Sequence, residues 1–132
     1  MKSLHLVAAL GVATLAAASV ACAQQSEETI PEAFRGEWNE EIDRCADLES
    51  GTRVVVRARS IVYFEEGDEV HSVTRLGPDT IRISATFETY DGSEPLTRTL
   101  TLSEAGEILT LTNSDGASSV NERCPQGDPD VE

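Results

Sequence analysis

The chain has 132 residues and a formal net charge of -14, from 24 acidic against 10 basic side chains. This length has room for one hydrophobic core and excludes an enzyme built from two lobes. The acidic excess argues against nucleic acid as a partner, because phosphates would be repelled and the arginines are scattered. With 39% hydrophobic residues and repeated β-branched runs, the chain is also too apolar to be disordered throughout.

The N-terminus has the pattern of an export signal. Residues 1–23 begin with a basic Lys2, continue through small and apolar residues, and end in an A-x-A motif at 21–23 that fits a signal cleavage site. The alternative is a lipoprotein signal, in which Cys22 is lipid-modified and becomes the new N-terminus. The first route predicts a periplasmic or secreted protein, and the second predicts a protein anchored to the cell envelope.

Two cysteines remain after the signal, Cys45 and Cys124. An oxidising compartment favours a disulfide between them, and the chain has no C-x-x-C motif that would indicate a metal or redox pair. The bridge would close a loop of about 80 residues, which is worth on the order of 4 kcal/mol in the chain-entropy model.

The rest of the chain divides into a tether, a domain and a tail. Residues 24–32 are polar and acidic, which predicts a disordered tether, and 126–132 form an acidic disordered tail. Between them, 33–125 repeats short runs rich in Val, Ile, Thr and Leu, separated by turn residues about every ten positions. The expected strands are 34–42, 52–58, 60–65, 69–76, 80–90, 95–103, 107–113 and 118–124.

Alternating hydrophobicity assigns a buried and an exposed face to these strands. Ile81, Ile83, Ala85 and Phe87 fall on one side of their strand, and polar residues fall on the other. The connections are too short for helical crossovers, so the strands should be antiparallel and meandering. About eight strands with one apolar face predict an all-β, up-and-down barrel, whose first and last strands the disulfide would join.

The start of this domain resembles a known family. Gly36-Glu37-Trp38 is similar to the G-x-W signature on the first strand of lipocalins and related calycin barrels. The resemblance implies that Trp38 closes one end of the barrel and that an arginine of the last strand, here Arg123, packs over its ring. In outline the chain is also similar to small exported bacterial β-barrels of unassigned function and to periplasmic inhibitors of lysozymes and metalloproteases.

Arg98 is the candidate ligand-binding residue, together with Tyr63 and His71. Alternation places Arg98 on the apolar face, where a charge must be paired or reach water. It would either pair with a carboxylate inside the barrel or anchor an anionic ligand, with Tyr63 and His71 lining the same cavity.

Catalytic and metal-binding patterns are weak. His71 is the only histidine after the signal, and no nucleophile or zinc motif surrounds it. The acidic turn 65–69 lacks the ligand spacing of a calcium loop and is expected to be a solvated hairpin tip. We therefore expect no enzyme, metal or cofactor. The expected role is that of a monomeric binding module of the cell envelope, for a small apolar or anionic ligand in the barrel. The alternative is an inhibitor or interaction protein that binds a cationic protein, such as a lysozyme, through its acidic surface.

Overall fold

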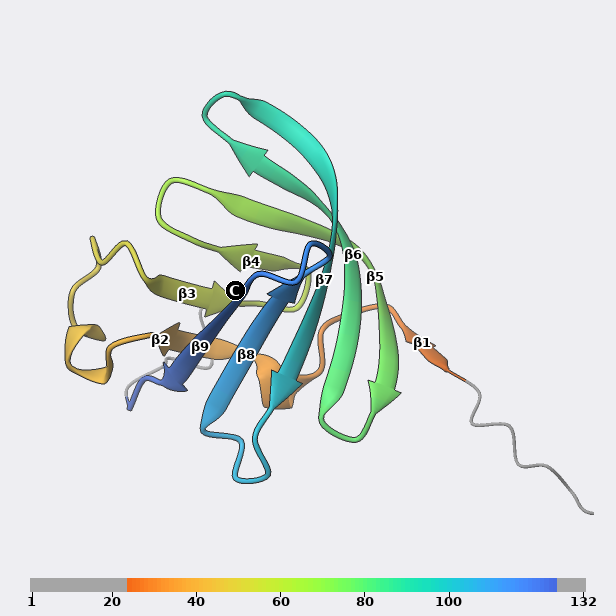
Figure 1. Cartoon of the computed structure of the whole chain (residues 1–132), viewed down its shortest axis with the longest axis horizontal. Helices are drawn as coiled ribbons and strands as arrows, with labels where there is room; N and C mark the ends of the chain where they lie inside the picture. Colours follow the sequence, from red (N-terminus) through yellow and green to blue (C-terminus); the bar gives the residue numbers. More distant parts are fainter. Residues whose placement is uncertain (1–23, 126–132) are drawn as a thin grey trace, which may run out of the picture.

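The structure, a computed structural model, describes residues 24–125, so the predicted signal and acidic tail lie outside the described residues. Eight strands form a closed antiparallel barrel, and one short strand is added at its side (Figure 1). The elements are β1 (Gln25–Glu27), η1 (Glu32–Phe34), β2 (Gly36–Asn39), η2 (Ile42–Arg44), β3 (Arg53–Val56), β4 (Ser60–Val62), β5 (Gly67–Gly77), β6 (Thr80–Thr89), β7 (Gly92–Leu102), β8 (Ile108–Asn113) and β9 (Ser118–Arg123).

The barrel closes in up-and-down order, as the sequence predicted. Each strand from β2 to β9 pairs with the next one along the chain, and β9 returns to β2. This last seam is short, because it holds only the pairs Trp38 with Arg123 and Asn39 with Glu122. The predicted disulfide between Cys45 and Cys124 is confirmed, and it lies directly beyond this seam.

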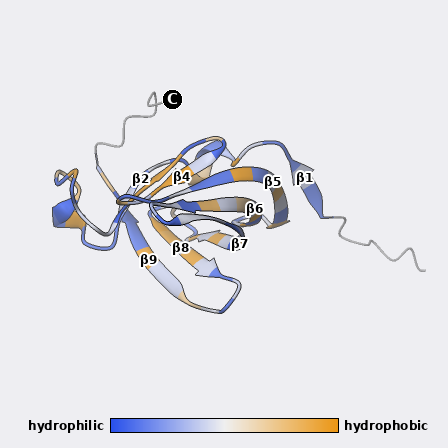
Figure 2. Ribbon diagram, turned by 90° about the horizontal axis from the view of Figure 1, so that it is seen from above, coloured by the Kyte–Doolittle hydropathy of each residue, from blue (hydrophilic) through white to orange (hydrophobic). Residues whose placement is uncertain are grey.

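The predicted alternation is also confirmed in the long strands. In β6, Ile81, Ile83 and Ala85 are buried, whereas Arg82 and Ser84 are exposed. Hydrophobic and hydrophilic bands follow each other along the ribbon of β5 (Figure 2). Buried apolar side chains of β2 to β8 pack with Ile30 and Phe34 into one core: Ile30, Phe34, Trp38, Val54, Val56, Ile61, Val70, Val73, Ile81, Ile83, Ala85, Leu100, Leu102, Leu109 and Leu111.

The predicted disordered tether over 24–32 is wrong for much of its length. Strand β1 pairs with the second half of β5, with Glu27 opposite Val73, and the Glu27 carboxylate accepts a hydrogen bond of 2.9 Å from Arg75. Ile30 is fully buried in the core. The segment is polar because it lies at the side of the barrel, and the free edge of β5 supplies the hydrogen bonds that order it.

The connections define two ends of the barrel. The "loop end" carries the loop 40–52 and the turns 63–66, 90–91 and 114–117, which join strands that finish and start there. The "capped end" carries η1 and the connections 57–59, 78–79 and 103–107. At the loop end the β4–β5 and β6–β7 hairpins project beyond the rest of the sheet (Figure 1).

The capped end is built around Trp38. The guanidinium carbon of Arg123 lies 4.0 Å from the centroid of the indole ring, and the indole N–H donates to the Phe34 carbonyl at 3.1 Å. Gly36 has a φ of +126°, and a Cβ at this position would lie only 3.2 Å from the Arg123 side chain. Glycine is therefore favoured here by its backbone conformation, and the Arg123 side chain would have to shift to accept any larger residue.

Candidate functional site

Arg98, the leading candidate from the sequence, is paired inside the barrel. Its Nε lies 2.9 Å from Asp68 Oδ2 and its Nη2 lies 3.1 Å from Asp68 Oδ1, so the contact is bidentate. The third nitrogen, Nη1, donates to the Asn113 side-chain carbonyl. The Asp68 side chain is fully buried and that of Arg98 is nearly so. Each nitrogen of the guanidinium thus already has a partner within the protein, which matches the first of the two roles expected for it.

Tyr63 belongs to the same internal network. Its hydroxyl donates to Asp68 Oδ2 at 2.8 Å, and the Arg98 guanidinium carbon lies 5.2 Å from its ring centroid. Burial, and next the charge of Asp68, raise the pKa of Tyr63 far above its ordinary value. The phenol therefore stays protonated and acts as a donor to the buried carboxylate.

Two expectations about neighbouring residues are wrong. His71 does not line the interior, because it sits at a bulge in β5, is exposed, and contacts Thr86 Oγ1 through its Nε2 at 2.7 Å. Asp68, expected in a solvated turn, is only 1% exposed because β5 begins at Gly67 and directs this side chain inward. The two-residue period explains both results, since one shift of register moves a side chain to the other face.

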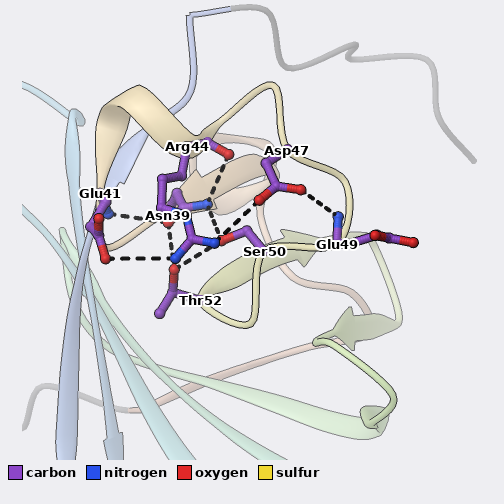
Figure 3. Close-up of polar contacts among 7 residues, drawn as sticks. All are labelled: Asn39, Glu41, Arg44, Asp47, Glu49, Ser50 and Thr52. Carbon is purple, nitrogen blue, oxygen red and sulfur yellow. Dashed lines mark hydrogen bonds and ion pairs between the residues drawn. The ribbon is translucent and has the colours of Figure 1, made fainter.

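The loop 40–52 is held in shape by a polar cluster beneath it (Figure 3). Asn39 and Ser50 are both fully buried, and the Asn39 amide donates to Ser50 Oγ at 3.2 Å. The Asn39 carbonyl accepts from Thr52 Oγ1 at 2.7 Å and from the Glu41 backbone N–H at 3.1 Å. Together with the disulfide at Cys45, these contacts order a connection that contains only one turn of 3-10 helix.

An open cleft of about 810 Å³ lies at the loop end, where the two projecting hairpins diverge. Glu65 and Glu66, with Val62 and Gly67, form one wall, and 88–90 form the other. The pair Gly67 with Glu88 is the last register pair between β5 and β6 on this side. Arg98, Tyr63 and His71 do not line this cleft, so the sequence-based candidates and the cleft are separate places in the molecule.

Most exposed large apolar side chains lie in the loop-end connections. Of the five large hydrophobic residues that are exposed in the described part of the chain, four lie in loop-end connections: Ile42, Leu48, Phe64 and Tyr90. Tyr90 is 98% exposed. Sequence reasoning missed these residues, although an aromatic residue within a hairpin turn was an available signal. Such side chains are typical of contact surfaces when they lie among polar groups.

Comparison of the chain with protein-family models, with curated proteins and with solved structures found no match. Within 24–125, no three His, Cys, Asp or Glu side chains are grouped so that they could hold a metal ion. No helix in the same part of the chain has the length and apolar character needed to cross a membrane.

Proposed function

We propose that this protein is a non-enzymatic interaction protein of the cell envelope that binds a cationic protein through the loop end of its barrel. The observation that carries this proposal is the cleft at that end, which three glutamates and the exposed Tyr90 line without any basic residue. A protein surface rich in carboxylates attracts a basic partner and speeds its association.

The remaining charges of the loop end strengthen the same preference. The loop 40–52 contributes Glu40, Glu41, Asp43, Asp47 and Glu49. Arg44 is the one basic residue in the four loop-end connections, and it is engaged with Asp47 at 3.2 Å and Glu41 at 3.9 Å. The electrostatic potential at the loop end is therefore negative. It favours a basic protein as the partner and disfavours an anionic ligand.

The Arg98–Asp68 pair inside the barrel also favours a protein partner at the loop end over an anionic ligand held within the barrel. An anionic ligand would need the Arg98 guanidinium, and Asp68 already occupies it at two points. Releasing that contact would leave a buried carboxylate without its counter-charge, which costs several kcal/mol.

The test is a binding measurement against a panel of basic proteins that includes lysozyme and cytochrome c, with an acidic protein of similar size as the control. We expect the dissociation constant to rise steeply with salt, because the Debye length falls from about 30 Å at 0.01 M to about 8 Å at 0.15 M. Failure of every basic protein to bind at low salt, or binding that does not respond to salt, would contradict the proposal.

A matched pair of variants tests which end of the barrel binds the basic protein. The loop-end triple variant E65Q/E66Q/E88Q and the capped-end triple variant E32Q/D79N/E104Q remove the same charge from exposed positions. We expect the first to weaken binding by more than tenfold and the second to have much less effect, because charges near the contact dominate at physiological salt. Equal losses would place the binding surface elsewhere.

A further inference from the structure

The cleft between the β4–β5 and β6–β7 hairpins has the features of a site for a single side chain. Gly67 lies between Val62 on β4 and Glu88 on β6 and has no side chain, which leaves space between the two walls at this position. A Cβ at Gly67 would lie 3.3 Å from the Ile61 carbonyl oxygen, so a larger residue is disfavoured there. The cleft is open to solvent and has a volume of about 810 Å³, so a side chain of another protein can enter it from outside.

The acidic residues of this cleft have no partners within the described part of the chain. Five arginines form ion pairs there, with Glu27, Glu28, Glu37, Glu41, Asp47 and Asp68. The side chains of Glu65, Glu66 and Glu88 take part in none of these pairs. They remain available for a positively charged group brought by another molecule.

Aromatic side chains are the second, independent feature. Tyr90 lines the cleft and is 98% exposed, and Phe64 is exposed in the facing turn. Leaving large rings in water has a free-energy cost that a contact would remove. Tyrosine is also among the residues that contribute most to protein–protein binding, and its ring face attracts cations.

The chemistry of the two features selects a guanidinium. A divalent metal needs several oxygens converging on one point, and the cleft glutamates are not grouped in that way. A guanidinium is planar, stacks on an aromatic ring, and carries five N–H donors that reach carboxylates lying apart from one another. An ammonium group is a compact charge and would use the aromatic wall less well.

We infer that this cleft receives one arginine side chain of the partner, stacked on Tyr90 and paired with Glu88 on one wall and with Glu65 or Glu66 on the other. This inference rests on the proposed function and names the contact at its centre. The arginine would be the anchor of the interface, and the exposed Phe64, which adjoins Glu65 in the turn 63–66, would lie beside it.

The test is an NMR titration of the ¹⁵N-labelled protein with a blocked peptide, acetyl-Ala-Arg-Ala-amide. The control peptides carry citrulline, the neutral analogue of arginine, or lysine in its place. We expect shifts that saturate and cluster at Gly67, Glu88 and Tyr90 with the arginine peptide, with the response at least several-fold weaker for both controls. Shifts spread over the whole acidic surface, or an equal response to citrulline or lysine, would overturn the inference.

Two variants separate this inference from the proposed function. We expect Tyr90→Ala and Glu88→Gln each to weaken the arginine peptide and the basic protein by roughly tenfold, the loss typical of a contact at the centre of an interface. Glu104→Gln at the capped end is the matched control and should bind normally. Salt-dependent protein binding that both cleft variants retain in full would refute the arginine site and leave the proposed function intact. Binding of the peptide in the cleft, without binding of any basic protein, would refute the proposed function.

Discussion

Arg98 and Asp68 lie 30 positions apart in the chain and meet inside the barrel, where the guanidinium contacts both carboxylate oxygens. Removing two charges from water is costly, and the attraction between them offsets this cost only with good geometry and further hydrogen bonds. Asn113 and Tyr63 supply those bonds. The network therefore makes β5, β7, β8 and the turn 63–66 mutually dependent.

Breaking this pair from one side should be more harmful than removing it completely. Asp68→Ala is expected to lower the free energy of unfolding by about 3–5 kcal/mol, because it leaves a buried guanidinium without its counter-charge. The double variant Arg98→Met with Asp68→Leu should lose markedly less. Urea denaturation of Asp68→Ala, of the single variants Arg98→Met and Asp68→Leu, and of the double variant provides the measurement. A double variant as unstable as the sum of the singles would show that the residues do not act as a pair.

Alkaline pH should destabilise the protein through Tyr63. Its pKa is raised in the folded state, so its contribution to stability is complete below the ordinary tyrosine pKa of 10.0 and is lost as the pH rises above that value. The free energy of unfolding should fall by about 1.4 kcal/mol for each pH unit above 10. Denaturant titrations of the wild type and Tyr63→Phe at several pH values above 10 test this prediction. The free energy of unfolding of the variant should fall less steeply with pH, because it has no phenol to ionise.

The disulfide should provide a large share of the stability. Cys45 and Cys124 are separated by 79 positions, and removal of such a long cross-link costs on the order of 4 kcal/mol in the chain-entropy model. We expect Cys45→Ser with Cys124→Ser to unfold at much lower denaturant concentration than the oxidised wild type. A loss below about 1 kcal/mol would indicate that the short β2–β9 seam is sufficient to close the barrel.

Gly36 should tolerate no side chain. Gly36→Ala places an alanine at positive φ and its Cβ against Arg123, which together are expected to cost about 1–3 kcal/mol. Gly51→Ala is the matched control, because its Cβ would meet nothing within 4 Å and Gly51 has no positive φ. Thermal unfolding of the two variants gives the comparison. Equal midpoints would contradict the role assigned to Gly36.

The fold was predictable because most strands carry their own two-residue pattern. Ile81, Ile83 and Ala85 identify the buried face of β6 without any knowledge of its neighbours, and short turns between such strands leave few topologies open. The disulfide followed in the same way, since Cys45 and Cys124 are the two cysteines outside the predicted signal. Each of these features can be identified from a short stretch of sequence, without knowledge of the residues it contacts in the fold.

The candidate site was not predictable to the same degree. Alternation indicated correctly that Arg98 faces inward, but it could not identify Asp68 as its partner, because the start of β5 depends on its pairing with β4 and β6. The cleft is formed between two successive hairpins, and its two walls come from opposite ends of the β5–β6 pair in the chain, at 62–67 and 88–90. Strand β1 was missed for a similar reason, since a polar segment becomes ordered only when the edge of β5 receives it.

Strand β1 also determines how the barrel would face a membrane. It starts at Gln25 beside Arg75, close to the capped end, and in Figure 1 it lies across the molecule from the hairpin tips. Three chain steps separate Cys22 from Gln25, a reach of about 10 Å at full extension. A lipid on Cys22 would therefore hold the capped end against the bilayer and turn the acidic cleft outward. Cleavage before Gln24 would release the same barrel with β1 complete, so both processing routes leave the cleft open to a partner.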